Sequence, residues 1–159
     1  MTIGPIITSW TEYADLAEKL LGEAAHSIDI LDNDLQALRL DRPSQIECLS
    51  RFLGRSPTTS LRIALRKTDV LRRQHPRLLE LLSTYAHKFH IREIPSHLSH
   101  LADCMLVVDR QSVLVRFHHD HARSREIRDD EEASKPYSKR FDEIWDEGGT
   151  PISAATTGL

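Results

Sequence analysis

The segment Ala102–Arg116 constrains the fold of this chain more than any other part of the sequence. It contains two apolar runs rich in β-branched residues, Cys104–Val108 and Val113–Val115, joined by the polar residues Asp109–Ser112. Short apolar runs bounded by polar turn residues are typical of strands that are covered on both faces. Because the connection is so short, the two strands must pair in antiparallel fashion. The segment therefore predicts a buried β-hairpin.

Helical and strand patterns alternate along the rest of the chain. Ser9 and Glu12 have the spacing of a capping box, which opens the first helix. Apolar residues at helical spacing predict helices over residues 10–24, 43–54, 76–88 and 137–147. Apolar or alternating segments predict further strands over residues 27–31, 61–66 and 89–94, and residues 118–132 are expected to form a polar loop.

This order of elements predicts the fold class. Strands separated by helices favour parallel pairing through right-handed crossovers, and the hairpin adds an antiparallel part. We therefore predict an α/β fold with three layers, α/β/α, around a mixed and mostly parallel sheet. A single domain is expected over residues 1–149, and the small, polar residues 150–159 are expected to form a flexible tail.

Composition bounds the classes of protein that the chain can belong to. The net charge of −3 over 159 residues gives no general attraction to nucleic acid or to an anionic membrane surface. No stretch approaches the roughly 18 consecutive apolar residues of a membrane span, and the first residues lack the pattern of a secretory signal. Cys48 and Cys104 fall inside predicted core elements, so we expect them to be reduced. These features predict a cytoplasmic protein without a membrane span.

The order of the segments resembles that of a known family. Residues 28–31, 61–66 and 91–95 lead to the hairpin segment 103–109, and a helix with the sequence Phe-Asp-Glu-Ile-Trp closes the pattern. Over roughly residues 10–147 this order resembles one phospholipase D-like domain. The signature of that family is a histidine, any residue, a lysine, four residues and an aspartate. A Gly-Ser pair follows after six more residues.

Most of the signature residues are replaced in this chain. When Asp109 is taken as the acid of the signature, the histidine position is Ala102 and the lysine position is Cys104. The Gly-Ser positions become Arg116 and Phe117. Asp109 is therefore the one signature residue that the chain keeps.

The resemblance implies that the reaction of the family is lost. The family histidine accepts the phosphoryl group covalently and the lysine holds the phosphate oxygens, which Ala102 and Cys104 cannot do. Active members also need a second motif, from a second copy or from a homodimer. We therefore expect a catalytically inactive binding or scaffolding module without a cofactor. The two-fold packing of the family implies that this module forms a homodimer.

Two groups of histidines could replace the lost chemistry. His100 precedes Ala102 by two residues, so on a strand the two would face the same side, about 6.6 Å apart. The second group follows the hairpin, and its candidate ligands for zinc or a similar ion are His118, His119 and His121, with Asp120 among them. Either group would make the chain a metal- or histidine-dependent phosphodiesterase or nuclease. The alternative is a polar loop at the surface.

Positive charge gathers in the middle of the chain, at Arg62, Arg66, Lys67, Arg72, Arg73 and Arg77. Arg62 and Arg66, together with Arg116, are candidate contacts for a phosphate-bearing ligand, including nucleic acid. The alternative is a solvated surface on which these arginines pair with neighbouring carboxylates.

The acidic turn Asp32-Asn33-Asp34 follows the first predicted strand. Ligands bind at strand ends in open α/β sheets, so this turn could hold a metal ion. Turn and helix-cap residues are the alternative interpretation.

Overall fold

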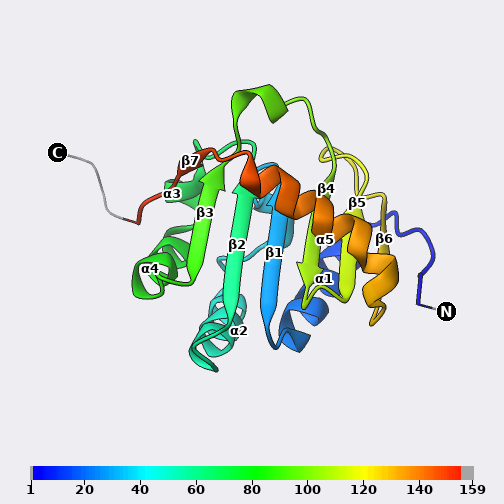
Figure 1. Ribbon diagram of the computed structural model, residues 1–159, viewed down its shortest axis with the longest axis horizontal. Coiled ribbons are helices and arrows are strands. Elements are labelled where there is room, and N and C mark those ends of the chain that lie inside the picture. Colours follow the sequence, from blue (N-terminus) through cyan, green and yellow to red (C-terminus); the bar gives the residue numbers. More distant parts are fainter. Residues whose placement is uncertain (1, 155–159) are drawn as a thin grey trace.

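The computed structural model describes residues 2–154, and a seven-stranded mixed sheet forms its centre (Figure 1). The strand order is β6-β5-β4-β1-β2-β3-β7. The strands are β1 (Ser27–Asp32), β2 (Ser60–Leu65), β3 (Phe89–Glu93), β4 (Cys104–Val108), β5 (Ser112–Arg116), β6 (Ser124–Ile127) and β7 (Thr150–Pro151). Strands β1, β2 and β3 run parallel, whereas β4, β5, β6 and β7 pair with antiparallel neighbours.

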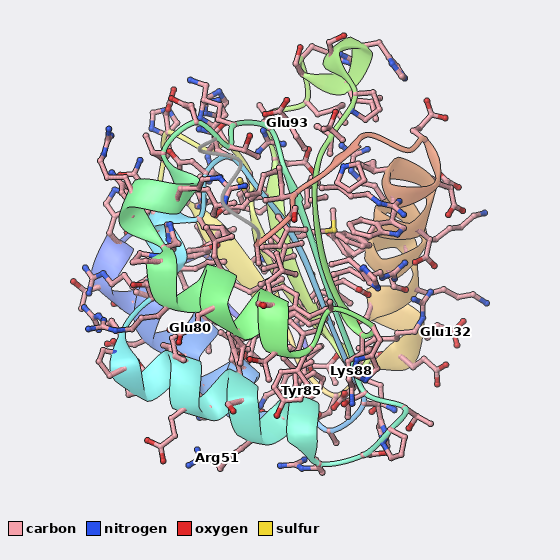
Figure 2. The ribbon with its side chains drawn as sticks, turned by 90° about the vertical axis from the view of Figure 1, so that its left-hand side faces the viewer. Arg51, Glu80, Tyr85, Lys88, Glu93 and Glu132 are labelled. Atoms are coloured by element: carbon pink, nitrogen blue, oxygen red, sulfur yellow. The ribbon has the colours of Figure 1, made fainter. Side chains whose placement is uncertain are left out.

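Helices cover both faces of this sheet, so the predicted three-layer α/β/α fold is confirmed. The helices are α1 (Trp10–Glu23), α2 (Pro43–Gly54), α3 (Leu71–Gln74), α4 (Pro76–Thr84) and α5 (Glu131–Asp146), with the short 3₁₀ helices η1 (Gln36–Leu38) and η2 (Ser96–Leu98). Figure 2 shows the sheet from its β3 side, with α2 and α4 on one face and α5 on the other. None of the described helices is long and apolar enough to cross a membrane.

Alternation along the strands sends side chains into two separate cores. In β4, Leu106 and Val108 pack into the core beneath α1, α2 and α4, whereas Met105 and Val107 pack beneath α5. All five residues of β4 and of β5 are buried, which confirms the hairpin predicted from its two apolar runs. Removal of this apolar surface from water is the main term that stabilises the fold.

The structure differs from the expected topology at the edges of the sheet. Among the described strands two neighbouring pairs are parallel and four are antiparallel, so the sheet is mixed but not mostly parallel. Strand β6 accounts for part of the difference, because residues 118–132 contain this short polar edge strand and the first residues of α5. In the predicted tail, Thr150 and Pro151 pair with β3, and residues 155–159 lie outside the described part of the chain.

Lys88 connects the end of α2 to the start of β3, beside Tyr85 (Figure 2). Only 8% of Lys88 is exposed, and its Nζ donates to the carbonyl oxygens of Leu53, at 2.6 Å, and of Ser56. Oγ1 of Thr59 donates to the same two oxygens, at 3.3 and 3.1 Å. The ammonium therefore adds a charged donor to carbonyl groups at and just after the end of α2, where its charge complements the helix dipole.

Replacement of this buried ammonium tests its contribution to stability. We expect Lys88→Met, which keeps an unbranched apolar side chain, to lower the free energy of unfolding by about 1–3 kcal/mol, because two carbonyl groups lose a charged donor and keep only neutral ones. Urea unfolding followed by circular dichroism measures the change. The matched control is Lys19→Met on the exposed surface of α1, which should change stability by less than about 0.5 kcal/mol. Equal effects of the two substitutions would contradict the assignment.

Candidate functional site

Strands β1 and β5 end, and β4 begins, at the upper edge of the sheet in Figure 1. Three polar side chains lie in one row at these strand ends. Leu31 pairs with Met105 across β1 and β4, and Cys104 pairs with Arg116 across β4 and β5. Asp32, the next residue of β1, therefore lies beside Cys104, which lies beside Arg116. The strand alternation directs all three side chains toward the layer that contains α1.

Arg116 is the centre of this row. Its Nη2 donates to Oδ1 of Asp32 at 2.7 Å, and only 2% of either side chain is exposed. Its Nη1 donates to the backbone oxygen of His119 at 2.5 Å. The guanidinium carbon lies 5.2 Å from the ring centre of Trp10 and 5.0 Å from that of Tyr13, which makes cation–π contacts with α1. A buried charge requires this degree of compensation.

Cys104 is held in the same row without the properties of a nucleophile. Arg66 adds a fourth side chain to the row, because its Nη2 lies 3.1 Å from the sulfur and 2.9 Å from the backbone oxygen of Asp103. Burial, and secondarily the neighbouring carboxylate of Asp32, raises the pKa of the Cys104 thiol far above its usual range. The thiol is therefore protonated at neutral pH, whereas nucleophilic cysteines act as thiolates.

Several polar atoms of the row are left without a partner among residues 2–154. They are Oδ2 of Asp32, Nε of Arg116, and Nε and Nη1 of Arg66, and all of them are buried. Buried polar atoms are normally paired. The row therefore keeps capacity to bind a further polar group.

A cleft of about 350 Å³ opens beside this row. Its lining includes Trp10, Asn33, Gln36, Arg39, Arg116 and His119. Leu35 and Arg39, on either side of η1, both have left-handed backbone conformations, with φ of 72° and 53°. Such conformations are unfavourable for these residue types and often occur at functional sites. Neither position holds a glycine or an asparagine, so the residue types alone do not indicate a left-handed conformation there.

The acidic turn forms part of the wall of the cleft. Asp32 is committed to Arg116 and to the backbone N–H of Asn33, and Oδ1 of Asp34 accepts from the backbone N–H of Gln36 at 3.1 Å. These contacts match the turn and helix-cap interpretation of Asp32-Asn33-Asp34, and the two carboxylates are not gathered around a common ion site.

Asp109 lies at the opposite end of β4 from Cys104, away from the cleft. Its carboxylate accepts hydrogen bonds from the backbone N–H groups of Ala25, His26 and Ser27 at 2.6–3.1 Å. The residue also has a positive φ of 56°, which aspartate tolerates in turns. Asp109 thus joins the end of α1 and the start of β1 to the hairpin turn.

The predicted arginine contacts divide between the two faces of the sheet. Arg66 and Arg116 belong to the row, but Arg62 lies on the α5 face, where it forms ion pairs with Asp29 at 2.8 Å and Asp142 at 2.9 Å. Burial raises the pKa of Asp29, although the pairing with Arg62 opposes this shift. Arg62 therefore compensates a buried carboxylate in the sheet.

The two histidine groups also differ in position. His100 is not on a strand, because β4 begins only at Cys104, and the ring of His100 contacts the backbone oxygen of His97 in the exposed η2 segment. By contrast, the ligand atoms of His118, His119 and Asp120 lie within 4.8 Å of one another at the rim of the cleft. His121 is not part of this group of three, although its ring centre lies 5.3 Å from that of His118.

Comparisons with known proteins agree with the fold. A family model described as a domain of unknown function (DUF7931) matches residues 9–153. No curated protein sequence matches significantly. Among solved structures, Nuc from Salmonella typhimurium, a phospholipase D family member, has a TM-score of 0.67 at 13% identity, with 95% of this chain and 97% of that chain covered. NucT from Helicobacter pylori has a TM-score of 0.62 at 9% identity, with 93% and 99% covered.

A DNA-binding protein has the same fold in part of its chain. TrmBL2, an archaeal chromatin protein with a novel mode of DNA binding, has a TM-score of 0.68 at 16% identity. The match covers 94% of the present chain but only 54% of TrmBL2, so the chain spans about half the length of that protein. At these identities the comparisons show a common phospholipase D fold.

Removal of the Asp109 carboxylate tests its structural role. We expect Asp109→Ala to lower the free energy of unfolding by about 2–4 kcal/mol, because three backbone N–H groups lose a charged acceptor. Asp109→Asn keeps one acceptor oxygen and tolerates a positive φ, so its loss should be smaller. Urea unfolding of the three proteins measures the order, and an Ala variant as stable as the unchanged protein would refute this role.

The buried pair at the centre of the row can be tested by a double-mutant cycle. Arg116→Met and Asp32→Asn should each lower the free energy of unfolding by about 3–5 kcal/mol, because each leaves a buried charge or donor uncompensated. The double variant should lose less than the sum of the two, by at least about 1 kcal/mol. Equilibrium unfolding of the four proteins gives the coupling energy, and strictly additive losses would contradict a direct ion pair.

Proposed function

This chain belongs to the DUF7931 family, and we propose that it is a catalytically inactive phospholipase D-like domain that binds a phosphate-bearing ligand at the cleft beside Arg116. The observation that carries the proposal is the pairing of Cys104 with Arg116 across β4 and β5. In the resemblance to the phospholipase D family, these positions hold the lysine and the glycine. In this chain the small residue, Cys104, is on β4 and the cation, Arg116, is on β5, the reverse of the family arrangement. Asp32 neutralises Arg116.

The absence of turnover follows from the groups that remain. Ala102 has no atom that could accept a phosphoryl group, and the protonated thiol of Cys104 is a poor nucleophile. In covalent enzymes the loss of the nucleophile lowers the rate by a factor of about a million. Arg116 cannot replace the family lysine in the reaction, because its charge is already paired with a buried carboxylate.

Binding of a phosphate-bearing ligand requires no nucleophile, and the cleft contains side chains that can contact such a ligand. Arg39 lines the cleft with an exposed side chain that has no hydrogen-bonding or ionic partner among residues 2–154. A guanidinium in that state is suited to contact phosphate oxygens. The exposed indole of Trp10 adds a surface on which a base could stack. Nucleic acid is therefore the phosphate-bearing ligand that we favour, and the DNA-binding relative of this fold supports that choice.

A second candidate function is a metal-dependent phosphodiesterase or nuclease. The close approach of His118, His119 and Asp120 is the observation in its favour. The candidate does not extend to His100, whose exposed ring contacts the η2 backbone.

We further propose a cytoplasmic location and a homodimer. Native mass spectrometry measures the subunit number.

Hydrolysis and binding can be measured on the same protein. We expect no turnover of bis(p-nitrophenyl) phosphate above the buffer rate, either with EDTA or with added Mg²⁺, Mn²⁺ or Zn²⁺. A short single-stranded oligonucleotide should bind and quench the fluorescence of Trp10. Arg39→Gln should weaken this binding by about tenfold, the effect of one lost charge-assisted contact of about 1.4 kcal/mol.

The matched control is Arg51→Gln, an exposed arginine on α2 (Figure 2), which should bind within about twofold of the unchanged protein. Turnover without metal would refute the inactive assignment. Metal-dependent turnover that His118→Ala abolishes would establish the second candidate instead. Equal losses of binding in the Arg39 and Arg51 variants would refute the cleft as the binding site.

A further inference from the structure

The loop between β5 and β6 gathers side chains with the chemistry of a metal site. We propose that His118, His119 and Asp120 bind one divalent transition ion, of which Zn²⁺ is the best fit. Two imidazoles and one carboxylate form a ligand set that such ions accept, and three protein ligands leave coordination positions open. This inference goes beyond the proposed function, because binding of an ion at the rim requires neither hydrolysis nor a phosphate-bearing ligand.

The distances within the group are close to those of a coordination sphere. Metal–ligand bonds of 2.0–2.2 Å place tetrahedral ligands about 3.4 Å from one another. One ligand atom from each of the three residues lies within 4.8 Å of the other two, and Nδ1 of His119 lies 2.9 Å from Oδ1 of Asp120. Nδ1 of His118 accepts a hydrogen bond from the backbone N–H of Asp120 at 3.1 Å, which an ion bound at this atom would displace. The side chains of His118 and Asp120 are 43% and 67% exposed, so small rotations can close the remaining gap.

The backbone that carries these ligands is already fixed. The N–H of His119 donates to the oxygen of Ala102 at 2.8 Å, and the oxygen of His119 accepts from the buried Arg116 at 2.5 Å. The N–H of His121 closes the turn by donating to the oxygen of His118 at 3.0 Å. An ion would therefore order side chains and not the loop itself, which lowers the entropic cost of binding.

The electrostatic surroundings admit a cation. The nearest buried cation, Arg116, is neutralised by Asp32, and Asp120 brings a negative charge to the site. The rings of His118 and His119 stack with their centres 4.5 Å apart, so the two imidazoles lie side by side at the site. His119 and Asp120 line the cleft, so the open coordination positions face it.

The chain offers clear controls among its other histidines. His97 is exposed and pairs with Glu147 in a different part of the surface, so it tests adventitious binding. His121 follows the group without belonging to it, so it tests whether the ligand set is His118, His119 and Asp120 or all three histidines. Asp120→Asn keeps the size of the side chain and removes its charge. Because the side chain of Asp120 is 67% exposed, we expect this variant to fold as the unchanged protein does.

The test is a titration of the full, untagged, EDTA-treated chain with Co²⁺, read by its visible absorption, and with Zn²⁺, read by calorimetry. We expect one ion per chain, with binding weakened at least about tenfold by His119→Ala and by Asp120→Asn. His97→Ala and His121→Ala should bind as the unchanged protein does. The proposal is overturned by a lack of binding, by an equal loss in the His97 variant, or by dependence on His121 without dependence on Asp120. None of these results bears on oligonucleotide binding through Arg39.

Discussion

The guanidinium of Arg116 is the interaction on which the arrangement of the site depends. From the end of β5 it reaches Asp32 at the end of β1, the backbone of His119 in the following loop, and the rings of Trp10 and Tyr13 on α1. One side chain thus holds a strand, a loop and a helix at the same edge of the sheet. Because the guanidinium is buried, each of these contacts compensates part of the hydration that it has lost. Removal of any one contact leaves the buried charge less well compensated.

The parts of the fold that the sequence predicted are those determined by local patterns. The apolar run of β4 and the helix cap at Ser9 specify their elements through neighbours within a few residues. Both elements form as predicted, and the Ser9 hydroxyl accepts from the backbone N–H of Glu12. Strand β6 was missed because Ser124–Ile127 is a short edge strand with one apolar residue, Ile127, and therefore shows no alternation of polar and apolar residues. The first part of α5, residues 131–136, was missed because it buries Ser134 and contains Pro136, and the apolar stripe begins only at Tyr137.

The site was harder to predict because its contacts depend on register between distant segments. Asp32 and Arg116 are separated by 84 residues, and only the pairing of β1 with β4 and of β4 with β5 brings them together. Arg62 and Arg66 are four residues apart but bind different partners. Arg62 lies within β2 and pairs with Asp29 on the α5 face, whereas Arg66 follows the end of β2 at Leu65 and contacts Cys104. The sequence shows that these residues are charged, but it does not show which group each of them will contact.

Under the proposed function, the residues at positions 104 and 116 depend on each other, because Cys104 and Arg116 pair across β4 and β5. The row provides one carboxylate, Asp32, and it is already paired with Arg116. A lysine at position 104 would place a second cation beside that guanidinium in a buried row, where like charges repel strongly and desolvation adds to the penalty. A small, uncharged residue at this position removes the conflict and leaves space for the arginine. Under the proposed function, the arginine at position 116 and the absence of a lysine at position 104 are therefore two parts of one arrangement, a structural ion pair beside the cleft.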